Sequence, residues 1–94
     1  FEVDLIVKDE GVVVAVECKS RLTREAVEEH GKRLGKIRRI ASGYEGKVLY
    51  GAVAGMVVEE EAQRVAEEEG LYVLRQSGES VEIANRPGFE PKKF

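Results

Sequence analysis

The sequence predicts a small α/β domain in which helices flank a mixed β-sheet. Its 94 residues suit one domain with one hydrophobic core. Apolar residues make up 43% of the chain, as in a globular protein, and no run of them is long enough to span a membrane. Segments of strand composition alternate with segments in which apolar residues recur at helical spacing. This alternation predicts the element order β-β-α-β-α-β-β.

The first two predicted strands, over residues 1–8 and 12–19, form a β-hairpin. Both are rich in β-branched residues, and a turn segment separates them. A two-residue loop at Glu10-Gly11 would pair the residue before the loop with the residue after it. That pairing fixes the register of both strands.

This register brings charged side chains together on one face of the hairpin. Asp4 lies directly opposite Glu17, and Glu2 lies opposite Lys19. The other face is apolar and includes Cys18, which we expect to be buried as a small hydrophobe. Aspartate is disfavoured in strands, and a buried carboxylate is costly unless it is paired. The cluster therefore indicates either a metal site or a structural group of ion pairs.

The next segment predicts a helix that begins after Thr23, its N-cap, and runs to about Ser42. Its apolar stripe includes His30. We expect His30 to pack at the edge of the core rather than to bind a metal, because Mg²⁺ prefers oxygen ligands. Gly31 and Gly35 weaken the helix and favour close approach of another backbone at this side.

The second half of the chain predicts three strands and one more helix. The strands cover residues 47–54, 71–74 and 81–83, and the helix covers residues 59–69. The first of these strands is almost entirely apolar, which is typical of a strand covered on both faces. The last is short and is expected at an edge of the sheet. The tail from Arg86 holds both prolines and predicts irregular structure.

The net charge is -3, and the charges are unevenly distributed. Basic residues outnumber acidic ones between positions 19 and 47, and the opposite holds between positions 48 and 70. Lys32, Lys36 and Arg39 fall on one stripe of the first predicted helix. They are candidates to follow a nucleic-acid phosphate backbone, and a merely solvated helix face is the alternative.

One occurrence of a short motif, Glu-x-Lys, differs from the other two in its surroundings. Glu-x-Lys occurs three times, but only Glu17-x-Lys19 ends a predicted buried strand and faces an aspartate. With Asp4, the β-turn, the following amphipathic helix and the hydrophobic strand, it resembles the PD-(D/E)xK nuclease superfamily. That superfamily includes restriction endonucleases, archaeal Holliday-junction resolvases and RecB-type exonucleases. Beyond Gly51 the chain looks like uncharacterised archaeal nuclease-like domains of this superfamily. Val3 stands where the named motif has proline.

The resemblance implies a restriction-endonuclease-like fold over residues 1–94, as one domain. It also implies Mg²⁺-dependent hydrolysis of DNA phosphodiester bonds, by an endonuclease or an exonuclease, with Mn²⁺ as an alternative metal. Asp4, Glu17 and the backbone carbonyl of Cys18 would bind the metal. Lys19 would orient or deprotonate the attacking water and contact the phosphate. The catalytic set is then Asp4, Glu17 and Lys19, and DNA is the expected partner.

Other interpretations stay open. Superfamily members usually have a helix before the first strand, and its absence from this sequence favours an inactive nuclease-fold module that binds DNA or protein. Gly31 and Gly35 leave a homodimer open, and Phe1 in place of an initiator Met leaves a larger parent chain open. The single cysteine excludes an internal disulfide and, without a signal-peptide pattern, indicates a cytoplasmic protein. The high charge content with few amide side chains resembles thermophile proteins.

Overall fold

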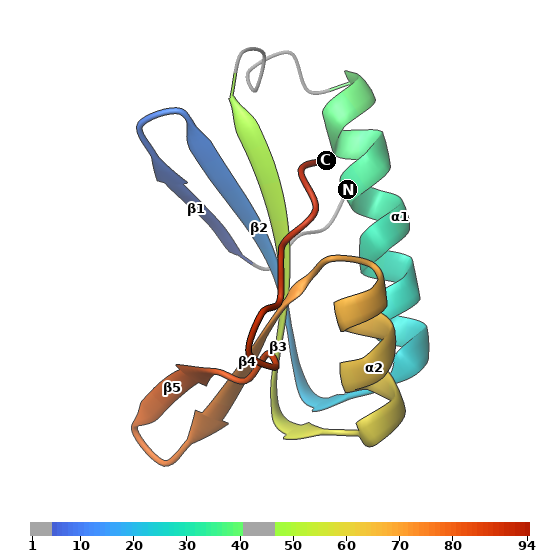
Figure 1. Cartoon of the computed structure of the whole chain (residues 1–94), viewed down its shortest axis with the longest axis vertical. Helices are drawn as coiled ribbons and strands as arrows, with labels where there is room; N and C mark the ends of the chain where they lie inside the picture. The colour runs from blue at the N-terminus through green and yellow to red at the C-terminus, as the bar shows by residue number, and fades with distance from the viewer. Residues whose placement is uncertain (1–4, 41–46) are drawn as a thin grey trace.

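The computed structural model describes residues 5–40 and 47–94 and shows a small α/β domain (Figure 1). The side chains of residues 5–9 and 39–40 lie outside this description. One mixed sheet is accompanied by two helices, which confirms the predicted class. The elements are β1 (Leu5–Asp9), β2 (Val12–Leu22), α1 (Arg24–Ile40), β3 (Val48–Val58), α2 (Glu60–Glu68), β4 (Tyr72–Ser77) and β5 (Ser80–Ile83).

The strands lie in the sheet in the same order as in the chain, from β1 to β5. The pairs β2–β3 and β3–β4 are parallel, whereas β1–β2 and β4–β5 are antiparallel hairpins. Each parallel pair is joined through a helix, and both crossovers advance the sheet in the same direction. Because such connections keep one hand, α1 and α2 lie on the same face of the sheet (Figure 1).

The hydrophobic core fills the layer between the sheet and the two helices. Side chains alternate along each strand, so every second residue of a central strand points into this layer. Gly51 of β3 leaves the space into which Leu34 and Leu71 pack. Fully buried apolar side chains come from β2 (Val13, Ala15, Leu22), β3 (Leu49, Val53), β4 (Val73), α1 (Val27, Leu34), α2 (Ala62, Ala66) and the segment before β4 (Leu71).

The opposite face of the sheet has no helix over it among the described residues (Figure 1). Met56, Val81 and Ile83 are more than 60% exposed. Cys18 is also exposed, so the prediction that it is buried was wrong. The physical reason is alternation, since Glu17 points toward the helices and its neighbour Cys18 must therefore point away from them.

The hairpin register follows the predicted two-residue loop. Gly11 has a φ of 72°, a conformation that L side chains rarely adopt. The Cα partners run from Asp9 opposite Val12 to Leu5 opposite Val16, which confirms the predicted pairing over β1. Asp4 and Glu2 lie outside the described residues, so their pairing with Glu17 and Lys19 stays a prediction.

Helix α1 begins where its cap residue predicts. Thr23 Oγ1 accepts a hydrogen bond from the backbone N–H of Ala26 at 3.3 Å. The predicted end at Ser42 lies outside the described residues. A Cβ built at Gly31 would lie 2.5 Å from Glu69 Oε1. The close neighbour at Gly31 is therefore a side chain at the end of α2 rather than another backbone.

The central strands are longer than predicted, because the parallel β2–β3 pairing continues as far as Leu22 opposite Val58. The tail after Ala84 has neither helix nor strand, but it is tied back to the sheet. Lys92 N–H donates to Gly70 O, and Phe94 N–H donates to Leu49 O. Among the described helices, none has the length and apolar character needed to cross a membrane.

Candidate functional site

Glu17 is the most unusual residue of the central sheet, because it is a carboxylate in an apolar layer. It lies in β2 two residues after Ala15, which is fully part of the core, and it is 5% exposed. An ionised carboxylate at such a position is costly unless cations and hydrogen-bond donors surround it. The function of this part of the molecule therefore depends on what Glu17 contacts.

Two cations hold the Glu17 carboxylate, one at each oxygen. Lys19 Nζ lies 3.5 Å from Glu17 Oε1, and Arg33 Nη1 lies 3.2 Å from Glu17 Oε2. The side chains are 6% exposed at Glu17, 30% at Arg33 and 49% at Lys19. Arg33 Nη2 is also 3.7 Å from Glu29 Oε2, one turn earlier on α1. We call Glu17, Lys19 and Arg33 the Glu17 cluster.

Arg33 was not among the site residues predicted from the sequence. A signal for it does exist in the spacing of α1. Arg33 comes three residues after His30 and four residues before Ile37, and both of these side chains are buried. A charged residue inside an apolar stripe indicates that the core offers it a partner, and here that partner is Glu17.

His30 fixes α1 against β2 next to this cluster. The imidazole is fully buried, and its Nε2 lies 3.0 Å from the backbone oxygen of Ala15. The prediction of a packed histidine is confirmed. With His30 on Ala15 and Arg33 on Glu17, one helix contacts two successive inward positions of the same strand.

The other predicted site residues are distributed differently. Asp4 and the side chain of Arg39 lie outside the described residues. Cys18 was proposed only through its backbone carbonyl, and its side chain lies on the opposite face. Lys36 is exposed on α1, and Lys32 lines a hollow between α1 and α2, away from the face that contacts Glu17. The structure thus brings Glu17 and Lys19 together but does not join Lys32 to them.

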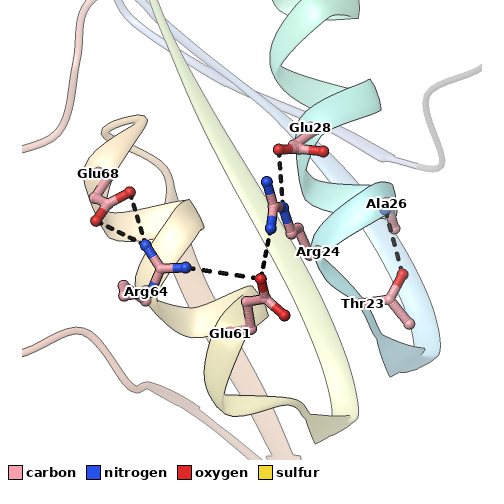
Figure 2. A network of polar contacts seen from close by, with 7 residues as sticks. All are labelled: Thr23, Arg24, Ala26, Glu28, Glu61, Arg64 and Glu68. Atoms are coloured by element: carbon pink, nitrogen blue, oxygen red, sulfur yellow. Dashed lines mark hydrogen bonds and ion pairs between the residues drawn. The ribbon is translucent and has the colours of Figure 1, made fainter.

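The hollow near Lys32 is a network of paired charges. Figure 2 shows Arg24 of α1 between Glu28 and Glu61, at 3.2 and 2.6 Å. Arg64 of α2 contacts the same Glu61 at 3.7 Å and Glu68 at 3.1 Å. The hydrogen bonds to Glu61 and Glu28 raise the pKa of the Arg24 guanidinium. Since both arginines already have carboxylate partners, this network joins the helices and is a poor track for phosphates.

The exposed face of the sheet holds an apolar hollow of about 280 Å³. Its walls come from Val16, Cys18, Ala54 and Leu74, and Lys19 stands at its rim. Gln76 also lines this hollow, so two side-chain donors, Lys19 and Gln76, border its apolar walls. The buried carboxylate of β2, Glu17, lies on the other, helix-covered side of the sheet.

A divalent cation suits the donor chemistry of this position only in part. Glu17 supplies one hard anionic oxygen ligand of the kind that Mg²⁺ prefers. Its two cationic neighbours, Lys19 and Arg33, already balance its charge and oppose the approach of a further cation. Among the residues whose side chains are described, 10–38 and 47–94, there is no group of three or more His, Cys, Asp or Glu that could hold a metal. Among the described residues, Glu17 therefore has no second acidic side chain beside it that could share a metal.

Comparisons with known proteins add no relative to this description: no protein-family model, no curated protein and no solved structure matches the chain.

Proposed function

We propose that this domain is a Mg²⁺-dependent deoxyribonuclease with a restriction-endonuclease-like fold, in which Asp4, Glu17 and Lys19 form the catalytic set. The observation that supports it most is the position of Glu17. This carboxylate is buried at the helix-covered face of a central strand, and Lys19 Nζ lies 3.5 Å from it. The resemblance to PD-(D/E)xK nucleases rests on this Glu-x-Lys, which lies in the middle of β2, where the buried part of the strand gives way to an exposed part.

The hairpin adds independent support. The pairing that β1 and β2 make over Leu5–Asp9 is the one that, continued by one residue, sets Asp4 against Glu17. A shift by one position would have turned Glu17 and Asp4 to opposite faces. The proposal requires the observed register, and a different register over Leu5–Asp9 would have contradicted it.

The proposed roles follow from charge and exposure. Glu17 and Asp4 supply anionic oxygen ligands, and the low exposure of Glu17 limits competition from bulk water. Lys19 is half-exposed, so its ammonium can reach a phosphate oxygen or an attacking water while staying near Glu17. When bound, the metal would lower the pKa of its water and neutralise charge on the scissile phosphate. Lys36 and Arg39 remain the proposed contacts to the DNA backbone, and Lys32 has less support because of its position.

The test is calorimetric titration with Mg²⁺ and with Mn²⁺, on the wild type and on Glu17→Gln and Asp4→Asn. The matched control is Glu90→Gln, which changes the exposed glutamate of another Glu-x-Lys in the tail. We expect both site variants to lose metal binding and the control to keep it. Cleavage of linear, nicked and four-way DNA by the wild type, and not by Glu17→Gln, would complete the support. Metal binding unchanged in Glu17→Gln would contradict the proposal.

A second function is supported by a different observation. Arg33 completes an ion-pair group around Glu17, and such a group can be purely structural. The domain would then be an inactive nuclease-fold module that binds DNA or protein. A DNA mobility shift with no cleavage in Mg²⁺ or Mn²⁺, together with no metal binding at Glu17, would favour this function.

A further inference from the structure

We infer that strand β5 is a homodimer interface, at which β5 of a second copy of this chain pairs antiparallel about a two-fold axis at Val81. The two sheets then become one continuous sheet. This inference concerns an edge strand that is separated from β2 by two other strands, and it does not rest on the proposed function. It is supported by the exposure of the β4–β5 hairpin, by the direction of its backbone groups, and by its apolar and charged side chains.

The β4–β5 hairpin stands out from the rest of the domain. Figure 1 shows it extending away from both helices, and every residue from Arg75 to Ile83 is exposed. Strand β5 is four residues long and lies at one edge of the sheet. A hairpin of two strands alone is marginally stable in water, whereas a third strand makes such a sheet stable. A further strand along β5 would therefore stabilise the exposed part of this hairpin.

The backbone of β5 is directed so that it can accept a further strand. Ala84 N–H donates to Val73 O at 2.8 Å, so these two residues form a hydrogen-bonded pair of the antiparallel ladder. Hydrogen-bonded and non-hydrogen-bonded pairs alternate along such a ladder. Glu82 therefore bonds to β4, whereas Val81 and Ile83 direct their N–H and C=O groups outward. No described strand lies on that side of β5.

The side chains of β5 give the edge little protection against pairing. Edge strands that stay single commonly carry lysine, proline or a bulge. The sequence of β5 is Ser-Val-Glu-Ile, and Val81 and Ile83 are each 65% exposed. Val81 is also a wall of the apolar hollow on the open face, together with Met56. A partner that pairs at Val81 would shield apolar surface and set two such hollows side by side.

The charge of Glu82 selects the register and favours a second copy as the occupant. Opposite residues of an antiparallel pair share a face, so the open faces of the two copies coincide only when odd-numbered residues pair with odd-numbered ones. An axis at Glu82 would set two carboxylates directly opposite each other, which is unfavourable. An axis at Val81 instead sets Ser80 of each copy opposite Glu82 of the other, as a hydroxyl donor to the carboxylate. Arg75 is the β4 partner of Glu82, on its other side. The edge is therefore complementary to itself.

The two-fold axis at Val81 uses the same atoms twice. Val81 N–H of each copy donates to Val81 C=O of the other copy, as expected of a contact between identical surfaces. The interface is small, so we expect a reversible dimer of modest affinity. It differs from the helix face at Gly31 and Gly35 that the sequence suggested, because Gly31 lies against Glu69 of its own chain.

The first experiment is sedimentation equilibrium of the wild type, Val81→Pro and Val81→Thr over a wide range of protein concentration. We expect a monomer–dimer equilibrium for the wild type. Proline removes the outward N–H of Val81 while keeping an apolar side chain, and it leaves the bonds from β5 to β4 intact. The dissociation constant of the dimer should rise about tenfold or more, because two symmetric hydrogen bonds are lost. Threonine keeps the N–H and suits a strand, so Val81→Thr is the matched control and should still dimerise.

The second experiment tests the register by disulfide cross-linking and does not depend on proline. Val81→Cys and Ile83→Cys are compared, each combined with Cys18→Ser to remove the native thiol. With the axis at Val81, the two Cα atoms at position 81 lie about 5.5 Å apart, within the range of a disulfide. The two Cα atoms at position 83 are separated by four residues along the strands, or about 13 Å. Oxidation should therefore link the Val81→Cys chains and leave the Ile83→Cys chains single.

Each outcome supports or overturns the inference without reference to metal binding or DNA cleavage. A dimer that Val81→Pro weakens and Val81→Thr keeps, together with linkage at position 81 alone, supports it. A wild type that stays monomeric up to millimolar concentration overturns it and leaves the edge to a different partner. A dimer that Val81→Pro does not weaken places the interface elsewhere. Linkage at position 83 alone, or equally at both positions, contradicts the register.

Discussion

Helix α1 makes ion pairs on two sides, one toward α2 and one toward the sheet. The two ion pairs differ in how far they are buried, and their distances do not show this difference. Toward α2, Arg24 lies 2.6 Å from Glu61, and both side chains are about half exposed. Toward the sheet, Arg33 lies 3.2 Å from Glu17, which is 6% exposed. Water screens the shorter pair and barely reaches the longer one. Burial, rather than the length of the contact, therefore decides which pair the fold depends on.

The largest effect is expected from breaking the buried pair. Arg33→Met should lower the free energy of unfolding by about 2 kcal/mol, because it leaves a buried carboxylate with Lys19 as its remaining cation. Urea unfolding at neutral pH measures the loss. Adding Glu17→Gln should recover much of it, since the unpaired charge is then gone. A loss no larger than that of Arg24→Met would contradict the comparison.

A change of opposite sign is expected at the point where α1 meets α2. Gly31→Ala should raise the free energy of unfolding by up to about 1 kcal/mol, because alanine favours a helix more than glycine does. The new methyl group would press on the Glu69 carboxylate, which is the mobile end of a side chain and can move toward water. Chemical unfolding compares the two proteins, and a clear loss of stability would show that Glu69 cannot move.

The exposed network should respond weakly. Arg24→Met should cost less than about 1 kcal/mol of unfolding free energy, as is usual for ion pairs at a surface. The cost should shrink further in high salt, which screens exposed charges. Arg33→Met should lose much less of its effect under the same conditions. If salt changed the unfolding free energies of Arg24→Met and Arg33→Met equally, the distinction between the exposed and the buried ion pair would be wrong.

The smallest effect concerns the pH dependence at Glu69. Burial, and then the nearby Glu28, raise the pKa of the Glu69 carboxyl, and no described group hydrogen-bonds its Oε2. A raised carboxyl pKa means that the folded state binds the proton more tightly than the unfolded state. Its stabilising contribution is therefore present below the ordinary glutamate pKa and is lost as the pH rises through the folded-state pKa.

Glu69→Gln removes this titration. Unfolding curves across the acidic range should show a variant whose stability falls less than that of the wild type as the pH rises toward neutral. Glu67, in the last turn of α2, provides the contrast to Glu69, which caps that helix. Despite burial, hydrogen bonds from Arg86 and Gln63 lower the pKa of Glu67. Its contribution is present above the ordinary glutamate pKa and is lost in acid. A Glu67→Gln variant with the same pH profile as Glu69→Gln would contradict both assignments.

The features of the fold that depend on a few neighbouring residues could be predicted from the sequence. The loop at Glu10-Gly11 predicted the hairpin register over β1, and Thr23 predicted the start of α1. His30 was expected to pack, and it is fully buried against Ala15. Each of these rests on turn geometry, capping or helical spacing, which act over a few residues.

The missed features depend on tertiary structure. Strand β2 is apolar on both faces between Val12 and Val16, so its composition cannot tell which face the helices cover. The helices lie over the face of Val13 and Glu17, which exposes Cys18 and brings Arg33 to the carboxylate. Periodicity within one strand gives two faces, but only the path of the following helix chooses between them.

The order of the strands has a consequence for how the chain folds. Each strand of the sheet pairs with the strand that precedes it in sequence, so no strand has to be inserted between two others that are already paired. The first hairpin can form early, and each later strand can add to the edge left by the one before. Contacts that close short loops are formed at a lower cost in chain entropy. Because the β1–β2 and β4–β5 hairpins both close two-residue loops, assembly outward from either of them costs the least chain entropy for this topology.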